Sequence, residues 1–309
     1  MPGLRRFPLP LIAAFFALYV IWGSTYLVIR IGVEYWPPLL LAGIRFVIAG
    51  SLMYAFLRWR GAPAPTWAQW KAAGIIGVLL LACGNGAVSV AEHTGVASGV
   101  AALAVATVPL FTLLCGYLWG ARNTRLEWAG IVLGLIGIAM LNLGSNLQSS
   151  PLGAALLIFA AATWAFGSVW SKHLPLPQGA MASAVEMLVG GVVLLIGSAV
   201  SGEHLEKMPP IEGWAALAYL TVFGSIIAFN AYMYLLKHVR PAAATSYAYV
   251  NPAVAVLLGI VFVGETIGIE EGLAMLVIIS AVVLIGLPQW RRSPPQPVVK
   301  AVPTESRVN

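Results

Sequence analysis

Polar side chains recur at helical spacing inside two apolar stretches of the sequence. Asn85, Ser89 and Glu92 stand at positions i, i+4 and i+7, and the stretch beginning at Asn230 repeats this spacing with polar residues at 234 and 237. Residues so spaced share one face of a helix. A polar face in an apolar segment suits either a hydrated pathway or interhelical hydrogen bonds. Both interpretations stay open, and we predict that the deepest pair, Asn85 and Asn230, binds a polar ligand.

A third apolar stretch, PAAATSYAYVNPAVAVLLGIVFVGE, holds Ser246, Tyr247, Tyr249 and Asn251 directly before Pro252. In a regular helix Ser246 and Tyr249 share one face, while Tyr247 and Asn251 lie on another, well over 100° away. We favour Ser246 and Tyr249 as the pair that faces a ligand. Because Pro252 removes a backbone donor, we expect a distortion of the helix near it.

Two charged residues stand inside other apolar stretches, where a charge is costly and is usually functional or paired. Arg45 could pair with Glu34 or Glu92 near one membrane surface, or it could take part in gating. Glu186 is a deep carboxylate and therefore a candidate for proton coupling, with a neutral, hydrogen-bonded acid as the alternative. Among the aromatic residues, we choose Trp164 as the one that packs on the side chain of a ligand.

The composition excludes a soluble protein. The 309 residues are 60% hydrophobic and 9% charged, whereas soluble domains are about 25% charged. The net charge of +6 comes from basic residues scattered between apolar runs, which flank membrane spans rather than bind nucleic acid. Phosphate-loop, zinc-protease and nucleophile-turn motifs are absent from the sequence, as is aspartate. We therefore expect no enzyme activity, no cofactor and no metal site.

Ten segments have the roughly 20 apolar residues that a spanning helix needs. The first lacks a convincing cleavage site, so we interpret it as a retained span and not as a signal peptide. The fold class that follows is an all-α polytopic membrane protein with ten transmembrane helices. The segments are residues 9–31, 38–58, 69–91, 97–119, 126–144, 152–172, 180–200, 213–236, 242–263 and 269–288.

The distribution of basic residues predicts the orientation, because cytoplasmic loops are enriched in Lys and Arg. With both termini in the cytoplasm, fourteen basic residues fall inside and Lys207 alone lies in an outer loop, where the glutamates collect. The fourteen are Arg5, Arg6, Arg58, Arg60, Lys71, Arg122, Arg125, Lys172, Lys237, Arg240, Arg291, Arg292, Lys300 and Arg307.

Three pairs of short motifs recur in the same order at an offset of 141–144 residues, so the second half of the chain repeats the first. Since five spans is an odd number, the second copy enters the membrane from the opposite side. Inverted repeats are typical of secondary transporters, whose substrate site lies between the halves, and the two prolines are candidate gating positions. The pairs are Gly23-Ser24 with Gly167-Ser168, Arg45 and Gly50 with Glu186 and Gly191, and Pro109 and Gly116 with Pro252 and Gly259.

This repeat divides the chain into two five-helix units between polar ends. The predicted divisions are a cytoplasmic N-terminus (1–8), the first repeat (9–144), an outer linker (145–151), the second repeat (152–288) and a disordered cytoplasmic tail (289–309).

The motifs WGSTY at 22–26, LAGIRFVIAG at 41–50 and SYAYVNPAVAVLLGIVFVGE at 246–265 resemble the EamA-type transporters of the drug/metabolite transporter superfamily, over about residues 9–288. Further matches (GNG, AEH and VPLFTL) resemble the bacterial inner-membrane branch of amino-acid exporters. Gly120-Ala121-Arg122 departs from the Gly-Glu-Arg common in this family. The resemblance implies an alternating-access exporter with a central cavity, built mainly by the third, fourth, eighth and ninth helices, with the fifth and tenth at the periphery.

These observations predict a plasma-membrane exporter of neutral, apolar or aromatic amino acids or related metabolites. Asn85, Asn230 and Ser246 would hold the ends of the zwitterion, and Trp164 and Tyr249 would pack on its side chain. The expected partners are this small molecule and the lipid bilayer, with the protein a monomer or weak homo-oligomer. The alternatives are efflux of lipophilic cations, which would need an acid such as Glu186, and, from another class, a membrane enzyme or a non-transporting scaffold.

Overall fold

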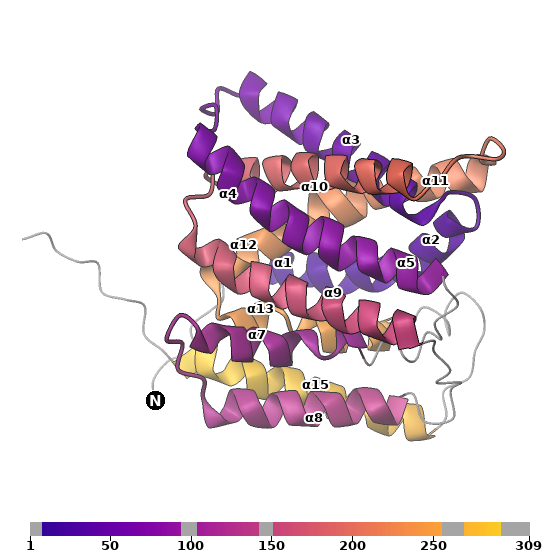
Figure 1. The fold of residues 1–309 in the computed structure, drawn as a ribbon. Helices are drawn as coiled ribbons and strands as arrows, with labels where there is room; N and C mark the ends of the chain where they lie inside the picture. Colours follow the sequence, from indigo (N-terminus) through magenta and orange to yellow (C-terminus); the bar gives the residue numbers. More distant parts are fainter. Residues whose placement is uncertain (1–7, 94–103, 142–150, 255–268, 292–309) are drawn as a thin grey trace, which may run out of the picture.

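The chain folds into a bundle of apolar helices. The computed structural model describes residues 8–93, 104–141, 151–254 and 269–291, and all regular structure within these ranges is helical (Figure 1). Six of its helices are long and apolar enough to cross a membrane, which makes the chain a polytopic membrane protein. These six are Leu9–Val33, Pro38–Trp59, Trp67–Ala91, Pro151–His173, Ala180–Val200 and Ile211–His238.

Three of the other four predicted spans lie partly outside the described residues, and the fourth, 269–288, lies in a described helix whose apolar stretch, Gly272–Pro288, is shorter than the six. The ten-span topology and the side on which the termini lie therefore stay predictions. At the C-terminal end, α15 (Ile269–Arg291) continues three residues into the segment that we predicted to be a disordered tail.

The described elements of the first half are α-helices and π-helical turns. In chain order they are α1 (Leu9–Phe16), η1 (Ala17–Ile21), α2 (Trp22–Val33), α3 (Pro38–Trp59), α4 (Trp67–Gly77), η2 (Val78–Gly86), α5 (Ala87–His93), α7 (Val108–Tyr117) and α8 (Arg125–Leu141). Those of the second half are α9 (Pro151–Trp170), η3 (Ser171–His173), α10 (Ala180–Val200), α11 (Ile211–Tyr219), η4 (Leu220–Phe229), α12 (Asn230–His238), α13 (Pro241–Ala244) and α15.

Helices of one half pack on helices of the other half, in pairs that the internal repeat relates to one another. The two most extensive helix contacts join α3 with α10 and α8 with α15, the second and seventh and the fifth and tenth predicted spans. The third span packs on the sixth through η2 and α9, and the first packs on the eighth. In Figure 1, α8 and α15 lie together at one edge of the bundle and α3 lies at the opposite edge. The pairing therefore follows the internal repeat, and α8 and α15 are peripheral.

Glycines allow the α3–α10 pair to approach closely. A Cβ atom built on Gly50 would lie 2.8 Å from the backbone nitrogen of Leu188, and one built on Gly191 would lie 2.8 Å from that of Val47. Small residues at such crossings bring transmembrane backbones into van der Waals contact, which is a main source of helix association in lipid. Gly50 and Gly191 are one of the motif pairs in the repeat, so the two halves meet through equivalent glycines.

Three spans contain π-helical turns, in which the backbone hydrogen bonds run from i to i+5. These turns are η1, η2 and η4. The turns η2 and η4 begin at residues 78 and 220, an offset of 142 that lies within the offset of the sequence repeat. Such turns are rare and are frequently found at functional sites.

The fourth and ninth predicted spans are interrupted. Residues 104–105 are helical, residues 106–107 form a turn, and α7 then begins with Pro109 in its first turn. In the ninth span α13 ends at Ala244, and the helix resumes at residue 247 after a turn at 245–246. The hydroxyl of Thr245 donates to the carbonyl of Pro241 (3.0 Å), and that of Ser246 donates to the carbonyl of Ala243 (2.7 Å). The break therefore lies where short polar side chains compete with the backbone ladder, six residues before Pro252.

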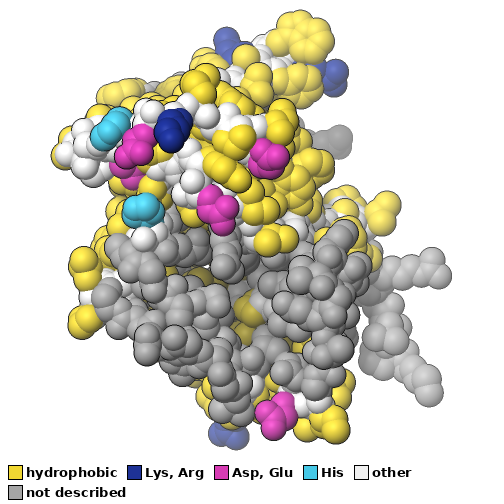
Figure 2. Space-filling view, turned by 90° about the vertical axis from the view of Figure 1, so that its right-hand side faces the viewer, with side chains coloured by type: hydrophobic (Ala, Val, Ile, Leu, Met, Phe, Trp, Pro, Cys, Tyr) yellow, Lys and Arg dark blue, Asp and Glu magenta, His cyan; other side chains and the backbone are white. Residues whose placement is uncertain are grey.

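Charge is distributed unequally between the two ends of the bundle. Figure 2 looks onto one end, where acidic side chains gather; the carboxylate of Glu203 there accepts from the backbone nitrogens of Leu39 (3.1 Å) and Leu40 (2.8 Å) and caps α3. The opposite ends of these helices carry basic residues such as Arg58 and Lys237. The glutamate-rich end is the one that we predicted to face outward.

Candidate functional site

A cavity lies between the two halves of the bundle. It contains about 840 Å³ of empty space, a figure that includes the open solvent at its mouth. Its lining comes from both halves and includes no residue of α8, α10 or α15. The lining residues are Trp22, Thr25, Ile29, Arg45, Phe46, Leu81, Gly84, Asn85, Val88, Val105, Val108, Leu157, Ala160, Ala161, Trp164, Gly224, Phe229, Tyr247 and Asn251.

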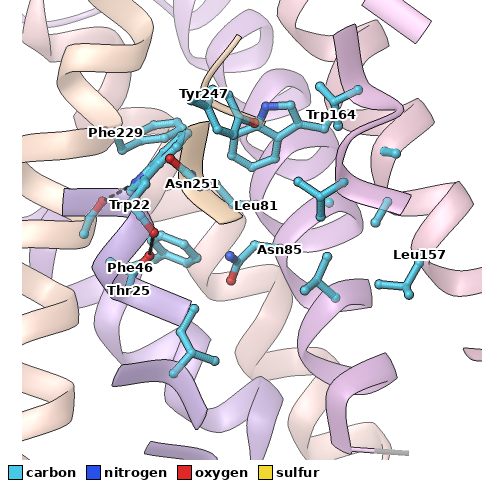
Figure 3. A pocket seen from close by; sticks show the side chains of 18 of the residues that line it. Trp22, Thr25, Phe46, Leu81, Asn85, Leu157, Trp164, Phe229, Tyr247 and Asn251 are labelled. Atoms are coloured by element: carbon cyan, nitrogen blue, oxygen red, sulfur yellow. Dashed lines mark hydrogen bonds between the residues drawn. The ribbon is translucent and has the colours of Figure 1, made fainter. Parts of the chain in front are cut away.

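Packed aromatic rings form one wall of this cavity. Trp22, Trp164 and Tyr247 approach one another at its edge (Figure 3), with ring centroids 5.6 Å apart for Trp22 and Trp164 and 4.9 Å apart for Trp22 and Tyr247. Behind them, the hydroxyl of the fully buried Tyr232 accepts a hydrogen bond from the indole of Trp164 (3.0 Å) and shares another with Ser168. These contacts fix the ring planes, so the wall is rigid before any ligand enters.

Amide and hydroxyl groups interrupt the apolar surface. The side chain of Asn85 points into the space between the Thr25–Phe46 side and the Leu157 side (Figure 3). The amide of Asn251, in the orientation that satisfies its neighbours, donates to the carbonyls of Tyr19 and Tyr247, both at 3.2 Å. A mainly apolar wall with a few placed polar groups is typical of small-molecule binding sites.

Arg45 also lines the cavity, and the ion pair with Glu34 that we considered is absent. Its side chain is 6% exposed, and its Nη2 donates to Oδ1 of Asn85 at 3.2 Å. The guanidinium carbon lies 4.2 Å from the centre of the Phe46 ring, while Nε is buried without a partner. Glu34 is solvent-exposed, and no described carboxylate pairs with Arg45; the side chain of Glu92 lies outside the described residues. The charge is therefore held by an amide and an aromatic ring.

The π-helical turns shape this part of the cavity. Leu81, Gly84 and Asn85 belong to η2, and Gly224 and Phe229 belong to η4. The indole nitrogen of Trp22, the residue that follows η1, donates to the carbonyl of Gly224 at 3.1 Å (Figure 3). The cavity thus lies where three spans depart from α-helical geometry.

The structure brings two of the five predicted ligand-binding residues, Asn85 and Trp164, to the cavity wall. Asn230 does not reach it: its amide nitrogen donates to the carbonyl of Ile226 (2.6 Å) and contacts the sulfur of Met53 (3.1 Å). The ten-residue π-helical segment η4 precedes Asn230 and rotates it relative to a 3.6-residue wheel.

We predicted that Ser246 and Tyr249 face the ligand. This prediction is wrong, because Tyr247 and Asn251, on the other face of the helix, line the cavity instead. The hydroxyl of Ser246 is bonded to that of Tyr19 (2.7 Å), and Tyr249 is buried against α8, where its hydroxyl donates to the carbonyl of Ile131 at 3.4 Å. The helix break at 245–246 sets the phase of the helix that follows. The spacing of Tyr247 and Asn251, four residues apart, was the sequence signal for this face.

Glu186, Pro109 and Pro252 lie away from the cavity lining. Glu186 is fully buried in α10, and neither of its carboxylate oxygens has a partner among the described residues. Pro109 is buried near the start of α7, and Pro252 lies within the helical residues 247–254. Their roles in coupling and gating, like that of Arg45 in gating, stay predictions.

At the basic end of the bundle, an ion pair that the sequence gave no sign of joins α8 to the start of α13. The Nε of Arg240 bonds Oε1 of Glu127, and its Nη2 donates to Oε2 at 2.8 Å and to the carbonyl of Arg122 at 3.0 Å. Glu127 also accepts from the backbone nitrogen (2.7 Å) and hydroxyl (3.0 Å) of Thr124. This reciprocal cap starts α8 and fixes the carboxylate in place.

A bundle of apolar spans arranged as two like halves around a cavity with polar groups defines a membrane transport protein. Known proteins agree with this class. The EamA-like transporter family matches the sequence twice, over residues 9–143 and 151–287, and the chain belongs to this family. It is therefore a transporter of the EamA type.

Individual relatives cover nearly the whole chain. The chain is 56% identical to the uncharacterized inner membrane transporter YedA of Escherichia coli K12, over 95% of this chain and 96% of that protein. It is 27% identical to the probable amino-acid metabolite efflux pump of Salmonella typhimurium, over 80% and 85% of the two chains. One crystal structure has the same fold, with a TM-score of 0.74, 21% identity and coverage of 92% and 99%. The protein is a multi-pass protein of the inner membrane.

Proposed function

We propose that this transporter exports neutral, apolar or aromatic amino acids or related small metabolites from the cytoplasm by alternating access. The observation that carries the proposal is the cavity between the halves, in which a rigid aromatic wall stands beside the polar side chains of Asn85, Thr25 and Asn251. Aromatic and aliphatic surfaces suit an apolar cargo side chain, while amides and hydroxyls suit the polar end of the molecule. The Salmonella relative, which carries an amino-acid metabolite efflux name, supports this cargo class.

Efflux of lipophilic cations is the weaker alternative. A cationic cargo favours a carboxylate in its binding site, yet none of the described residues that line the cavity is acidic, and Arg45 contributes a positive charge. Glu186, the acid that this alternative requires, lies in α10, which does not line the cavity. The charge in the cavity therefore favours a neutral or anionic cargo.

The proposed motion follows from the packing of the halves. Because helices of the two halves pack on one another around the cavity, rocking of one half against the other would expose the cavity alternately to the two sides. We propose ten spans with both termini cytoplasmic for this cycle. Reporter fusions at residues 1 and 309 test the topology, and a reporter that is active only outside the cytoplasm should stay silent at both positions.

Flux measurements test the transport proposal directly. The purified chain in proteoliposomes should show saturable uptake of at least one amino acid from a labelled panel that includes phenylalanine, leucine and threonine. Val88→Trp fills the cavity wall and should abolish this flux. Val132→Trp, at a lipid-facing position of α8 that is 54% exposed, is the matched control and should leave it intact. If no amino acid of the panel shows saturable flux, the transport proposal is rejected. Saturable flux would in turn distinguish a transporter from a membrane enzyme or a non-transporting scaffold.

A further inference from the structure

We propose that Arg45 and Asn85 form an anion subsite that binds the carboxylate of the cargo. The cargo would then be monocarboxylates with an apolar or aromatic side group. Where the cargo is an amino acid, its ammonium group would not be recognised by a charged residue. The inference rests on the proposed function only for its statement about cargo, since the subsite itself is defined by side chains of the described cavity.

The guanidinium of Arg45 is buried, and no carboxylate of the described residues pairs with it. A buried charge is costly unless it is paired and hydrogen-bonded. Arg45 has five N–H donors, of which only Nη2 bonds a described residue, and Nε is buried without a partner. Because the residue lines the cavity, an anion that enters the cavity can approach the guanidinium, although Nε itself is buried. A carboxylate has the planar, two-oxygen geometry that the guanidinium fork accepts.

Asn85 and Phe46 hold the guanidinium in place for such a ligand. Asn85 accepts from Nη2 through Oδ1, and Phe46 lies under the guanidinium carbon at 4.2 Å. The amide nitrogen of Asn85 donates to no described residue, so it stays available as a further donor toward the cavity. Both contacts fix the guanidinium plane through neutral groups, and no carboxylate among the described residues compensates its positive charge.

The rest of the cavity orients the remainder of the cargo. The aromatic wall of Trp22 and Trp164 gives the apolar part of the molecule a rigid surface. An ammonium group would find no carboxylate among the described lining residues, only carbonyl and hydroxyl acceptors. The cavity therefore distinguishes cargo molecules by their carboxylate and their apolar part, and tolerates loss of the amine.

Four related ligands test this on the purified full-length chain. The probes are 3-phenylpropanoate (acid only), phenylalanine (acid and amine), phenylalaninamide and 2-phenylethylamine (amine only). Equilibrium dialysis should show that both carboxylates bind, and that the two amines bind at least about tenfold more weakly, because a charge-assisted pair is lost. Amines that bind as tightly as the carboxylates, or carboxylates that show no saturable binding, overturn the proposal.

Variants locate the effect at Arg45. Arg45→Gln should remove the preference for carboxylates, so that acid and amide bind alike. Arg58→Gln removes the same charge from the exposed end of the same helix and should keep the preference. Arg45→Lys keeps the charge without the planar fork and should weaken carboxylate binding less than Arg45→Gln does; it also serves if the glutamine variant does not fold. A preference that survives in both Arg45 variants rejects the subsite.

Flux measured on the same variants separates this inference from the transport proposal. Binding of 3-phenylpropanoate that depends on Arg45, without flux of any probe in proteoliposomes, rejects the proposed function and leaves the subsite intact. Saturable phenylalanine flux that is unchanged in Arg45→Gln rejects the subsite and leaves the proposed function intact.

Discussion

Arg240 precedes α13 at the basic end of the bundle, whereas Arg45 lies inside α3 at the cavity, and the two arginines differ in the anion that they meet. Arg240 meets the carboxylate of Glu127 with two of its nitrogens and the carbonyl of Arg122 with one of them. Its side chain is 19% exposed and that of Glu127 1% exposed. Arg45, which is more deeply buried, has one amide oxygen and one aromatic ring as neighbours.

The difference separates a charge that holds structure from a charge that is available to a ligand. At the basic end, the anion is part of the protein, so α8 and α13 are joined whatever the cavity contains. In the cavity, the protein supplies the cation and its positioning contacts, and the anion has to come from elsewhere. We therefore expect opposite results at the two sites. Changing Arg240 or Glu127 should lower the stability of the protein, whereas changing Arg45 should lower its binding of the ligand.

The largest expected effect is on the paired site. Glu127→Gln removes the carboxylate that Arg240 bonds, so the free energy of unfolding should fall by about 3 kcal/mol, the lower end for a broken buried pair. Thermal unfolding of the purified protein at a fixed scan rate measures this. Arg125→Gln, an exposed charge in the first turn of α8, is the control and should change stability by less than about 0.5 kcal/mol. Equal midpoints for the two variants would show that the pair has no structural role.

A double-mutant cycle sharpens the same point. Glu127→Leu and Arg240→Met should each destabilise the protein, while the double variant should be more stable than the sum of the two predicts, with a coupling energy of about 2 kcal/mol. Additive effects would mean that each residue acts through its other contacts, such as Thr124 for Glu127.

At the cavity site, the missing anion can be added. At ten times its dissociation constant, 3-phenylpropanoate should stabilise the wild-type protein by about 1.4 kcal/mol, from the linkage of binding to unfolding. It should not stabilise Arg45→Met. The unfolding midpoint with and without ligand gives both values. Equal stabilisation of the two proteins would mean that the ligand binds elsewhere.

The smallest expected effect is the loss of Arg45 in the absence of ligand. Arg45→Met removes a buried, unpaired charge, so stability should change by less than about 1 kcal/mol in either direction. The same unfolding assay, run beside Glu127→Gln, measures the contrast. A loss as large as that of Glu127→Gln would show that Arg45 is structural, as Arg240 is.

The sequence predicts the membrane class of this fold well. Long apolar segments report spanning helices directly, and Gly50 and Gly191 recur in the repeat because both sit where backbones meet. Asn85 and Trp164 were placed correctly because each side chain turns inward within its span.

The rest of the site could not be predicted from helical periodicity. Asn230 follows the π-helical segment η4, and Tyr249 follows a break at residues 245–246, so a regular helical wheel assigns both to the wrong face. Arg45 was difficult for a different reason. The sequence indicated its depth and its possible acidic partners, but only the three-dimensional packing shows that no described carboxylate pairs with it. Glu127, at a helix start, carried no sign of the distant Arg240.

The pairing of helices across the halves has a consequence for synthesis. Spans of the first half leave the ribosome about 7–28 seconds before their partners, at about 5–20 residues per second. During that interval the glycine face of α3 has no α10 to meet, and α8 has no α15. Individual helices can insert and wait in lipid, since insertion precedes association. The first half must therefore reside in the membrane as an open set of helices, and the native bundle closes only when the last span, α15, arrives.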